Sequence, residues 1–157
     1  MKRIRVYLLF LLLGLSFCTS ESYPPFEFFY NITGEKAVVI SILPVETGVE
    51  MHTRVYPEDG QIGVGEVASR DDSRILTLQE AGEVRRLFTA VDFTLINDGN
   101  YIPPLDASLW AVNTRETAGD YYSVLEPGEA IEERNLSELV ALGTLLWNLA
   151  ELDGMYY

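Results

Sequence analysis

The order of apolar and polar residues divides the chain into short strand-like stretches and longer helix-like ones. Residues 36–43 form an apolar, β-branched run without a helical period, which predicts a central strand that Pro44 ends. Residues 50–56 and 61–67 predict two further strands. The polar stretch 68–74 predicts a loop between these strands and the first helix.

Residues 106–127 carry two alternating runs about a turn-forming centre, where Gly119 is available for a positive φ, and this pattern predicts a β-hairpin. The hairpin places Trp110, Tyr121 and Tyr122 within reach of one another. Because side chains alternate across a strand, Trp110 and Val112 should share the face that meets the helices. If both were exposed instead, the three aromatic rings would form a candidate binding surface.

Two stretches have a helical period. Thr77 and Glu80 form a capping-box pattern at the start of the first helix. Asn135 and Glu138 repeat this pattern before a second helix over residues 136–152, which is apolar enough to be buried on more than one side. The core-facing positions expected on the first helix are Ala81, Val84, Leu87, Phe88 and Val91, and on the second Leu139, Leu142, Leu146 and Leu149.

These elements predict an α+β fold, in which an antiparallel sheet of about five strands is covered on one face by two helices. The length of 157 residues suits a leader and one domain, which we place at residues 35–157. Residues 21–34 combine Pro24 and Pro25 with several aromatic residues and predict an N-terminal arm or a first strand. The two prolines favour an edge or an irregular start for it.

Residues 1–20 have a basic start, an apolar run over residues 6–17 and small residues after it, as in a secretory signal peptide. We expect export to the periplasm or the exterior. Cleavage after Ser20, which makes Glu21 the first mature residue, is the first expectation. The alternative is lipid attachment at Cys18, the only cysteine, because the LSFC sequence resembles the lipobox of bacterial lipoproteins. A retained apolar run would be only about 18 Å long as a helix, against a hydrocarbon core of about 30 Å.

The charge balance narrows the classes of partner. The chain has 11 Lys and Arg against 24 Asp and Glu, a net charge of −13. Lys2, Arg3 and Arg5 leave with the leader, which lowers the net charge from −13 to −16. Such a surface repels phosphate backbones and anionic lipid headgroups, so nucleic acid is excluded as a partner. A basic partner or Ca²⁺ would be attracted, but the ligand spacing of a calcium loop is absent around Asp98.

Residues for catalysis, cofactor binding or metal binding are not assigned by the sequence. His52 is the only histidine and falls in a predicted strand, without a G-x-S-x-G nucleophile elbow in the chain. Zinc sites need several His or Cys ligands. A pair of carboxylates would suffice for a glycosidase, but 24 acids make such a pair inevitable. The densest acidic group, which we interpret as a solvated loop, contains Glu126, Glu129, Glu132 and Glu133.

From Thr77 onward the layout resembles a loosely defined group of uncharacterised small bacterial exported proteins. Their shared pattern is a capped helix, a hairpin with a Trp in its first strand, and a terminal Leu-rich helix. The resemblance implies an α+β domain and carries no function. The residues that carry it are Leu87, Phe88, Trp110, Tyr121 or Tyr122, Val124, Pro127, Leu139, Leu142, Leu146 and Leu149.

The sequence therefore predicts an exported, non-catalytic binding or structural module of the cell envelope, without a cofactor, whose partner is a protein or a small ligand. An acidic inhibitor of a cationic enzyme is one alternative. A hydrolase that works with two carboxylates is another. The oligomeric state stays open.

Overall fold

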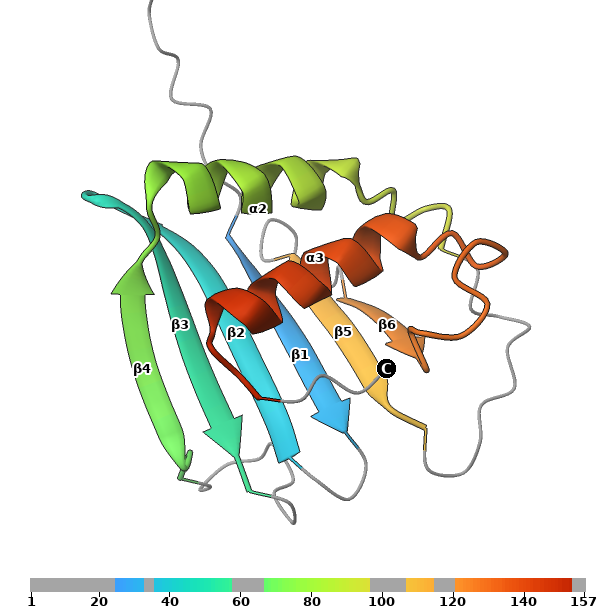
Figure 1. The fold of residues 1–157 in the computed structure, drawn as a ribbon, viewed down its shortest axis with the longest axis horizontal. Coiled ribbons are helices and arrows are strands. Elements are labelled where there is room, and N and C mark those ends of the chain that lie inside the picture. The colour runs from blue at the N-terminus through green and yellow to red at the C-terminus, as the bar shows by residue number, and fades with distance from the viewer. Residues whose placement is uncertain (1–24, 33–35, 58–66, 97–106, 115–120, 154–157) are drawn as a thin grey trace, which may run out of the picture.

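The computed structural model describes residues 25–32, 36–57, 67–96, 107–114 and 121–153. These residues form one antiparallel sheet of six strands in the order β4-β3-β2-β1-β5-β6, with helices α2 and α3 on one face (Figure 1). The predicted α+β class is confirmed, with one strand more than expected. The elements are β1 (Phe26–Ile32), β2 (Lys36–Val45), β3 (Gly48–Tyr56), β4 (Arg70–Ile75), α2 (Leu78–Ala90), β5 (Leu109–Thr114), β6 (Tyr121–Leu125) and α3 (Ser137–Leu149).

Helix α2 carries the chain across the sheet. The strand before it, β4, lies at one edge, and the strand after it, β5, lies four positions along the sheet. Four strand spacings amount to about 19 Å, and a helix of 13 residues rises by about 20 Å. The length of α2 therefore matches the distance that the chain must cover (Figure 1).

The predicted N-terminal arm contains an inner strand. β1 lies between β2 and β5, not at an edge of the sheet. Its residues alternate, so that Phe26, Phe28 and Tyr30 point to the helices and are at most 1% exposed, whereas Glu27 and Phe29 lie on the opposite face. Both prolines come before Phe26 in the sequence, so neither lies within the strand.

The predicted loop at residues 68–74 is largely a strand. β4 pairs antiparallel with β3, with Thr53 opposite Asp72 and Arg54 opposite Asp71. The predicted strand over residues 61–67 lies outside the described residues except for Val67, which belongs to no strand. An edge strand tolerates charges on both faces, and these charges discourage pairing with another chain.

Pro44 does not end its strand, contrary to the prediction. β2 continues to Val45, and Pro44 pairs with Val49 of β3. On the other side of β2, the pairing with β1 ends at Ile42. The missing amide hydrogen of the proline therefore falls where β2 has only one neighbouring strand.

The predicted cap of α2 is confirmed. The Thr77 hydroxyl accepts a hydrogen bond from the Glu80 amide at 3.2 Å, and the Glu80 carboxylate accepts one from the Thr77 amide at 2.7 Å. Val84 and Leu87 are buried on the predicted face, and Val91, which follows the helix, is buried as well. Ala81 and Phe88 are partly buried against the same core.

The predicted cap of α3 is wrong. Asn135 adopts a left-handed backbone conformation with φ of 56°, and its side-chain amide donates to the carbonyl of Leu95 at 3.1 Å. The N-cap position is occupied by Leu136, which makes no side-chain capping bond. Asn135 instead reverses the chain, since asparagine tolerates this conformation better than most residues do. The helix ends at Leu149, before the predicted limit, and the predicted stop at Gly154 lies outside the described residues.

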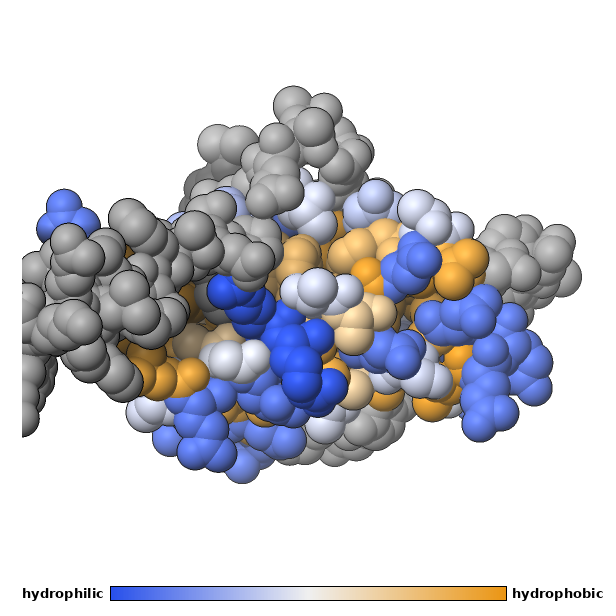
Figure 2. Space-filling model, turned by 90° about the horizontal axis from the view of Figure 1, so that it is seen from above, coloured by the Kyte–Doolittle hydropathy of each residue, from blue (hydrophilic) through white to orange (hydrophobic). Residues whose placement is uncertain are grey.

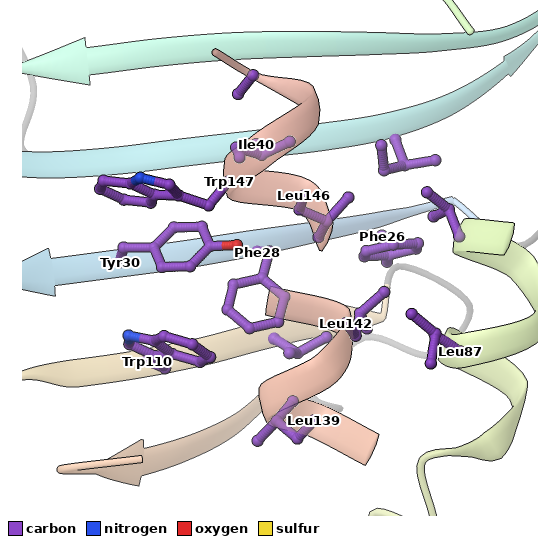
Figure 3. Close-up of a cluster of buried hydrophobic side chains, with 14 of the residues drawn as sticks. Phe26, Phe28, Tyr30, Ile40, Leu87, Trp110, Leu139, Leu142, Leu146 and Trp147 are labelled. Atoms are coloured by element: carbon purple, nitrogen blue, oxygen red, sulfur yellow. The ribbon is translucent and has the colours of Figure 1, made fainter. Parts of the chain in front are cut away.

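The core lies between the sheet and the two helices (Figure 3). At its centre the Tyr30 hydroxyl donates to the carbonyl of Gly143 in α3 at 2.7 Å. The Tyr30 ring meets Trp110 and Trp147 edge to face, with centroid distances of 5.2 Å and 5.1 Å. Gly143 is required at this point because a Cβ there would lie only 2.3 Å from the Trp110 ring. α3 is thus locked onto β1 and β5 by one polar contact and close aromatic packing.

Candidate functional site

The predicted hairpin is confirmed, and its tryptophan belongs to the core. Trp110 pairs with Val124, and Val112 with Tyr122, across β5 and β6. Trp110 and Val112 are each 1% exposed, so they share the face toward the helices as predicted. Tyr122 is half-buried and stacks on Phe93 at a centroid distance of 4.5 Å.

Because Trp110 is buried, it cannot form part of a surface that binds a partner. The side chain of Tyr121 lies outside the described residues. The candidate aromatic surface therefore reduces to the partly exposed ring of Tyr122, which already has an intramolecular partner in Phe93.

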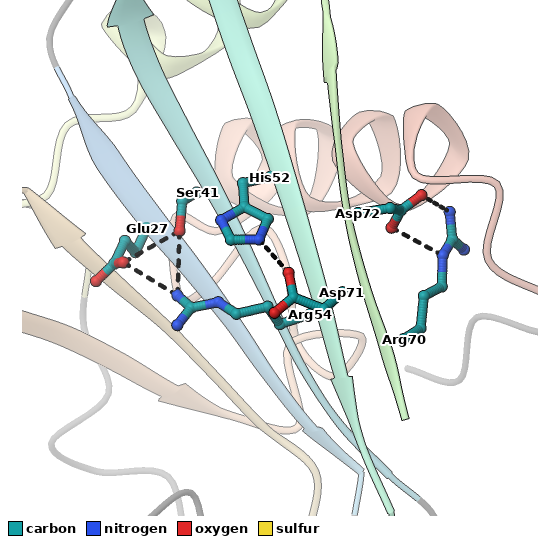
Figure 4. A network of polar contacts seen from close by, with 7 residues as sticks. All are labelled: Glu27, Ser41, His52, Arg54, Arg70, Asp71 and Asp72. Atoms are coloured by element: carbon teal, nitrogen blue, oxygen red, sulfur yellow. Dashed lines mark hydrogen bonds and ion pairs between the residues drawn. The ribbon is translucent and has the colours of Figure 1, made fainter. Parts of the chain in front are cut away.

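A polar network lies on the other face of the sheet, which we call the open face because α2 and α3 do not cover it (Figures 1 and 4). The register places Glu27, Ser41 and His52 side by side in one row across β1, β2 and β3. Arg54 and Asp71 lie opposite each other in the neighbouring row of β3 and β4. The alternation of side chains sends all five to the open face.

The inner half of the network is a buried acid held by a serine and an arginine. The Ser41 hydroxyl donates to Glu27 Oε1 at 3.1 Å. Arg54 Nη2 donates to the same Glu27 oxygen at 3.4 Å and to the Ser41 hydroxyl at 3.3 Å. Glu27 is 8% exposed and Ser41 2% exposed. A buried carboxylate needs such partners because an unpaired one would be strongly destabilising.

The outer half of the network reaches the solvent. His52 Nε2 lies 2.5 Å from Asp71 Oδ1, and their side chains are 32% and 60% exposed. The Arg54 side chain is 30% exposed, its two hydrogen bonds are long, and its Nε atom is buried without a hydrogen-bond partner among the described residues. Among the described residues, the side-chain hydrogen bonds of Arg54 come from Nη2 alone, and its buried Nε is out of reach of an external partner.

Ser41, His52 and Asp71 do not form a catalytic triad. A triad requires the histidine to accept the serine proton on one ring nitrogen while the acid holds the other. Here the Ser41 hydroxyl donates to Glu27 and not to His52, although the two residues are opposite in the register. The arrangement consists of two neighbouring groups, Glu27 with Ser41 and Arg54, and His52 with Asp71.

Three carboxyl groups of the described residues have lowered pKa values. Arg74 and the cap at Thr77 lower the pKa of Glu80 to about 2. Arg86 lowers the pKa of Glu83, and hydrogen bonds from Thr94 lower that of Asp92. These shifts favour the ionised form, whereas a general acid needs a raised pKa. The three groups stabilise helix α2 and the turn after it.

The dense acidic group lies in the loop between β6 and α3. Glu126 accepts a hydrogen bond from the Ser108 amide at 2.6 Å, which ties this loop to the start of β5. Arg134, which is 4% exposed, donates to the carbonyls of Leu125, Glu126 and Glu129. Three exposed acids complete the group, namely Glu129, Glu132 and Glu133. The loop is organised by backbone contacts of Arg134, and its acids are largely solvated.

The hollows of the described surface differ in size. One of about 80 Å³ lies between β3, β4 and the end of α3, and it is lined by Thr53, Arg70, Asp72 and Arg74 among others. Ligand pockets usually measure about 300–1,000 Å³. Its two arginines are already paired with Asp72 and Glu80.

No protein-family model matches the chain, and neither does any curated protein. Among the described residues, three or more His, Cys, Asp or Glu side chains nowhere gather in a group that could hold a metal ion. The described helices are also too short or too polar to cross a membrane.

Five residues of the open face were missed as a site by sequence reasoning, which treated His52 as an ordinary strand residue. They come from four strands, and Glu27 and Asp71 are 44 positions apart in the chain. The only local signal is the alternation within FEFFYNI, which places Glu27 opposite the aromatic face of β1.

Proposed function

We propose that the protein is an exported, non-catalytic module of the cell envelope that binds a partner through the open face of its sheet. Export rests on the leader at residues 1–20, with its basic start and apolar run. The binding role rests on the polar network of the open face. The partner supplies a carbonyl or carboxylate oxygen to Arg54 and a hydrogen-bond donor to Asp71.

The incomplete pairing of Arg54 is the observation that carries this proposal. Its guanidinium is held in place from below by Glu27 and Ser41, yet both contacts exceed 3.2 Å. A guanidinium fixed in position loses little conformational freedom on binding, and its planar fork suits an oxygen acceptor. His52 and Asp71 flank it with a further donor and acceptor, which allows a partner to be oriented.

Photo-crosslinking in cells that make the protein tests the open face. Asp71 and Asp72 are adjacent, and they are 60% and 54% exposed, but they lie on opposite faces of β4. A benzoylphenylalanine placed at position 71 should give a discrete adduct, and one at position 72 should not. Arg54→Gln should abolish the adduct, whereas Arg70→Gln, which breaks the ion pair on the other face, should leave it unchanged.

Equal labelling from both positions, or an adduct that survives Arg54→Gln in a folded protein, would contradict binding through the open face. The intact mass of the protein recovered from cells tests export independently. A mature chain that begins at Glu21 or at an acylated Cys18 supports export, and the full-length chain in the cytoplasm refutes it.

An acidic inhibitor of a cationic enzyme is the second candidate. A surface hollow lined by Asp92, Glu132 and Glu138, without a basic residue, favours it, together with the net charge of −16 after removal of the leader. Binding of this kind should weaken steeply up to about 0.5 M salt, because the Debye length falls to a few Å. Affinity that is independent of salt would reject it.

The hydrolase alternative has a direct assay. Purified protein is incubated with a panel of glycosides, beside Glu27→Gln and Asp71→Asn, which remove the two acids of the polar network. Turnover that either variant abolishes would overturn the non-catalytic proposal. We expect no turnover, because both acids are paired with Arg54 or His52.

A further inference from the structure

The N-terminal segment joins the domain at one particular end of the sheet. β1 begins at Phe26, and Phe26 pairs with Ile42 near the end of β2. The β2–β3 turn, the end of β4 and the start of α2 lie at this same end, which is the upper end in Figure 1. Any anchor that precedes β1 therefore holds the domain by this end.

Exposed apolar side chains gather at the same end. Leu78 is 95% exposed, Ile75 48% and Val45 36%. Ile75 lies against the β2–β3 turn, since its Cγ2 is 3.6 Å from the position that a Cβ on Gly48 would take. We call Val45, Ile75 and Leu78 the apolar rim. Figure 2 views the molecule from this end, and hydrophobic side chains there lie between hydrophilic ones.

Single exposed apolar residues are normal on a protein surface, so position matters more than number. The described chain has two other exposed large hydrophobic residues, Val67 and Leu95. Val67 lies at the opposite end of the sheet, since it precedes Ser69, whose amide donates to the carbonyl of Val55 near the end of β3. The rim is thus distinguished by its three members and by its place beside the start of β1.

We propose that the apolar rim contacts the lipid surface that anchors the chain through its N-terminal segment. The inference rests on the export and envelope location proposed above. An acylated Cys18 and a retained apolar run ending at Phe17 both put the lipid surface about eight residues before Phe26. The seven residues 19–25 can span at most about 25 Å.

The length of residues 19–25, which we call the tether, limits which end of the sheet can face the lipid. β2 has 10 residues, so the sheet is about 33 Å long. If the end of the sheet that carries Val67 faced the membrane, the start of β1 would lie about 33 Å away from it. That distance exceeds the reach of the tether, which is at most about 25 Å. The tether therefore excludes an orientation in which the end that carries Val67 faces the lipid.

The negative charge of the protein determines which lipids the rim can contact. The net charge, −13 with the leader and −16 expected after its removal, disfavours adhesion to anionic lipid. On α2, Arg86 is paired with Glu83 at 2.7 Å, so the helix offers little unpaired positive charge of its own there. The contact should accordingly be shallow, apolar and independent of the anionic lipid content.

Depth-dependent fluorescence quenching tests the proposal on the membrane-anchored full chain. The protein is recovered from cells in detergent and reconstituted into phosphatidylcholine vesicles that contain doxyl-labelled lipid. A dansylalanine replaces Leu78 in one preparation and Val67 in the control. Both positions are highly exposed, at 95% and 86%, so neither change should disturb folding.

The probe at position 78 should shift its emission to the blue and lose most of it to the doxyl lipid, and the probe at 67 should do neither. Equal quenching at both positions, or none at 78 in an anchored chain, overturns the lipid contact while export and open-face binding stand. A recovered mass that begins at Glu21 removes the anchor and overturns the inference, again without affecting export. Quenching at 78 that requires anionic lipid contradicts the apolar mode of contact.

Discussion

Replacing Gly143 with alanine is the sharpest test of how the core is assembled. A Cβ at this position would lie 2.3 Å from Trp110 Cζ3 and 2.9 Å from Cε3 and Cη2. Carbon atoms in contact are normally about 3.5–4.0 Å apart. The Trp110 ring is 1% exposed and is packed against Phe28 and Tyr30, so it cannot swing aside. Helix α3 must therefore withdraw from the sheet by more than about 1 Å.

Three effects set the size of the loss. Overpacking of a core costs about 1–3 kcal/mol. Withdrawal of α3 stretches the 2.7 Å bond from Tyr30 to the Gly143 carbonyl, and an unsatisfied buried group costs about 1–3 kcal/mol. Alanine returns about 1 kcal/mol through its better helix propensity. We expect a net destabilisation of about 1–5 kcal/mol, a large share of the typical stability of about 5–15 kcal/mol.

Urea unfolding monitored by tryptophan fluorescence measures this loss, because Trp110 and Trp147 are both buried and become exposed on unfolding. Gly82→Ala is the matched control, since Gly82 lies within α2 and a Cβ there would have no atom within 4 Å. That variant should gain about 0.5–1 kcal/mol. In a Trp110→Phe background, Gly143→Ala should cost less, as a double-mutant cycle would reveal.

A Gly143→Ala protein as stable as the wild type would refute the close approach of α3 to Trp110. So would equal effects of alanine at Gly143 and Gly82, because helix propensity alone would then explain both. A loss of the same size in the Trp110→Phe background would show that the destabilisation arises from some contact other than this ring.

Two further predictions concern titratable groups. The pKa of Glu80 falls from 4.5 to about 2, so its contribution is complete above pH 4.5 and is lost as the pH falls toward 2. Allowing for its partial exposure, we expect Glu80→Gln to cost about 1–2 kcal/mol at pH 7, because the ion pair with Arg74 is lost. The gap between the two proteins in urea should narrow below pH 4.5, and a constant gap would argue against the shift. Tyr30→Phe should cost about 1 kcal/mol by removing the buried hydrogen bond from the Tyr30 hydroxyl to the Gly143 carbonyl. Because burial raises the pKa of Tyr30, wild-type stability should decline as the pH rises above about 10, and equally steep alkaline unfolding of Tyr30→Phe would contradict this.

Local signals in the sequence predicted well the elements that contacts within one segment define. The capping box at Thr77 and Glu80 needs only residues three positions apart, and its two hydrogen bonds form as expected. The hairpin at residues 106–127 likewise depends on neighbouring runs, and the alternation correctly turned Trp110 inward. Both patterns hold because periodicity determines which face of an element is apolar.

Other elements were mispredicted where neighbouring strands decide the structure. The sequence RDDSRI has no apolar alternation, and it becomes β4 because β3 offers it hydrogen-bonding partners. Pro44 stays within β2 because the pairing of β2 with β1 has ended by that point. Asn135 turns the chain and bonds the Leu95 carbonyl, 40 positions away, instead of capping α3.

The sequence alone determined the fold class, two helices with their apolar faces, the inward position of Trp110 and the acidic charge. Only the tertiary structure decided that β1 is an inner strand and that Glu27, Ser41, His52, Arg54 and Asp71 meet on one face. The physical reason is that hydrophobic periodicity is a local property, readable from a few consecutive residues. Strand order and register instead depend on hydrogen bonds between segments far apart in the chain, and a shift of one residue would move every side chain of a strand to the opposite face.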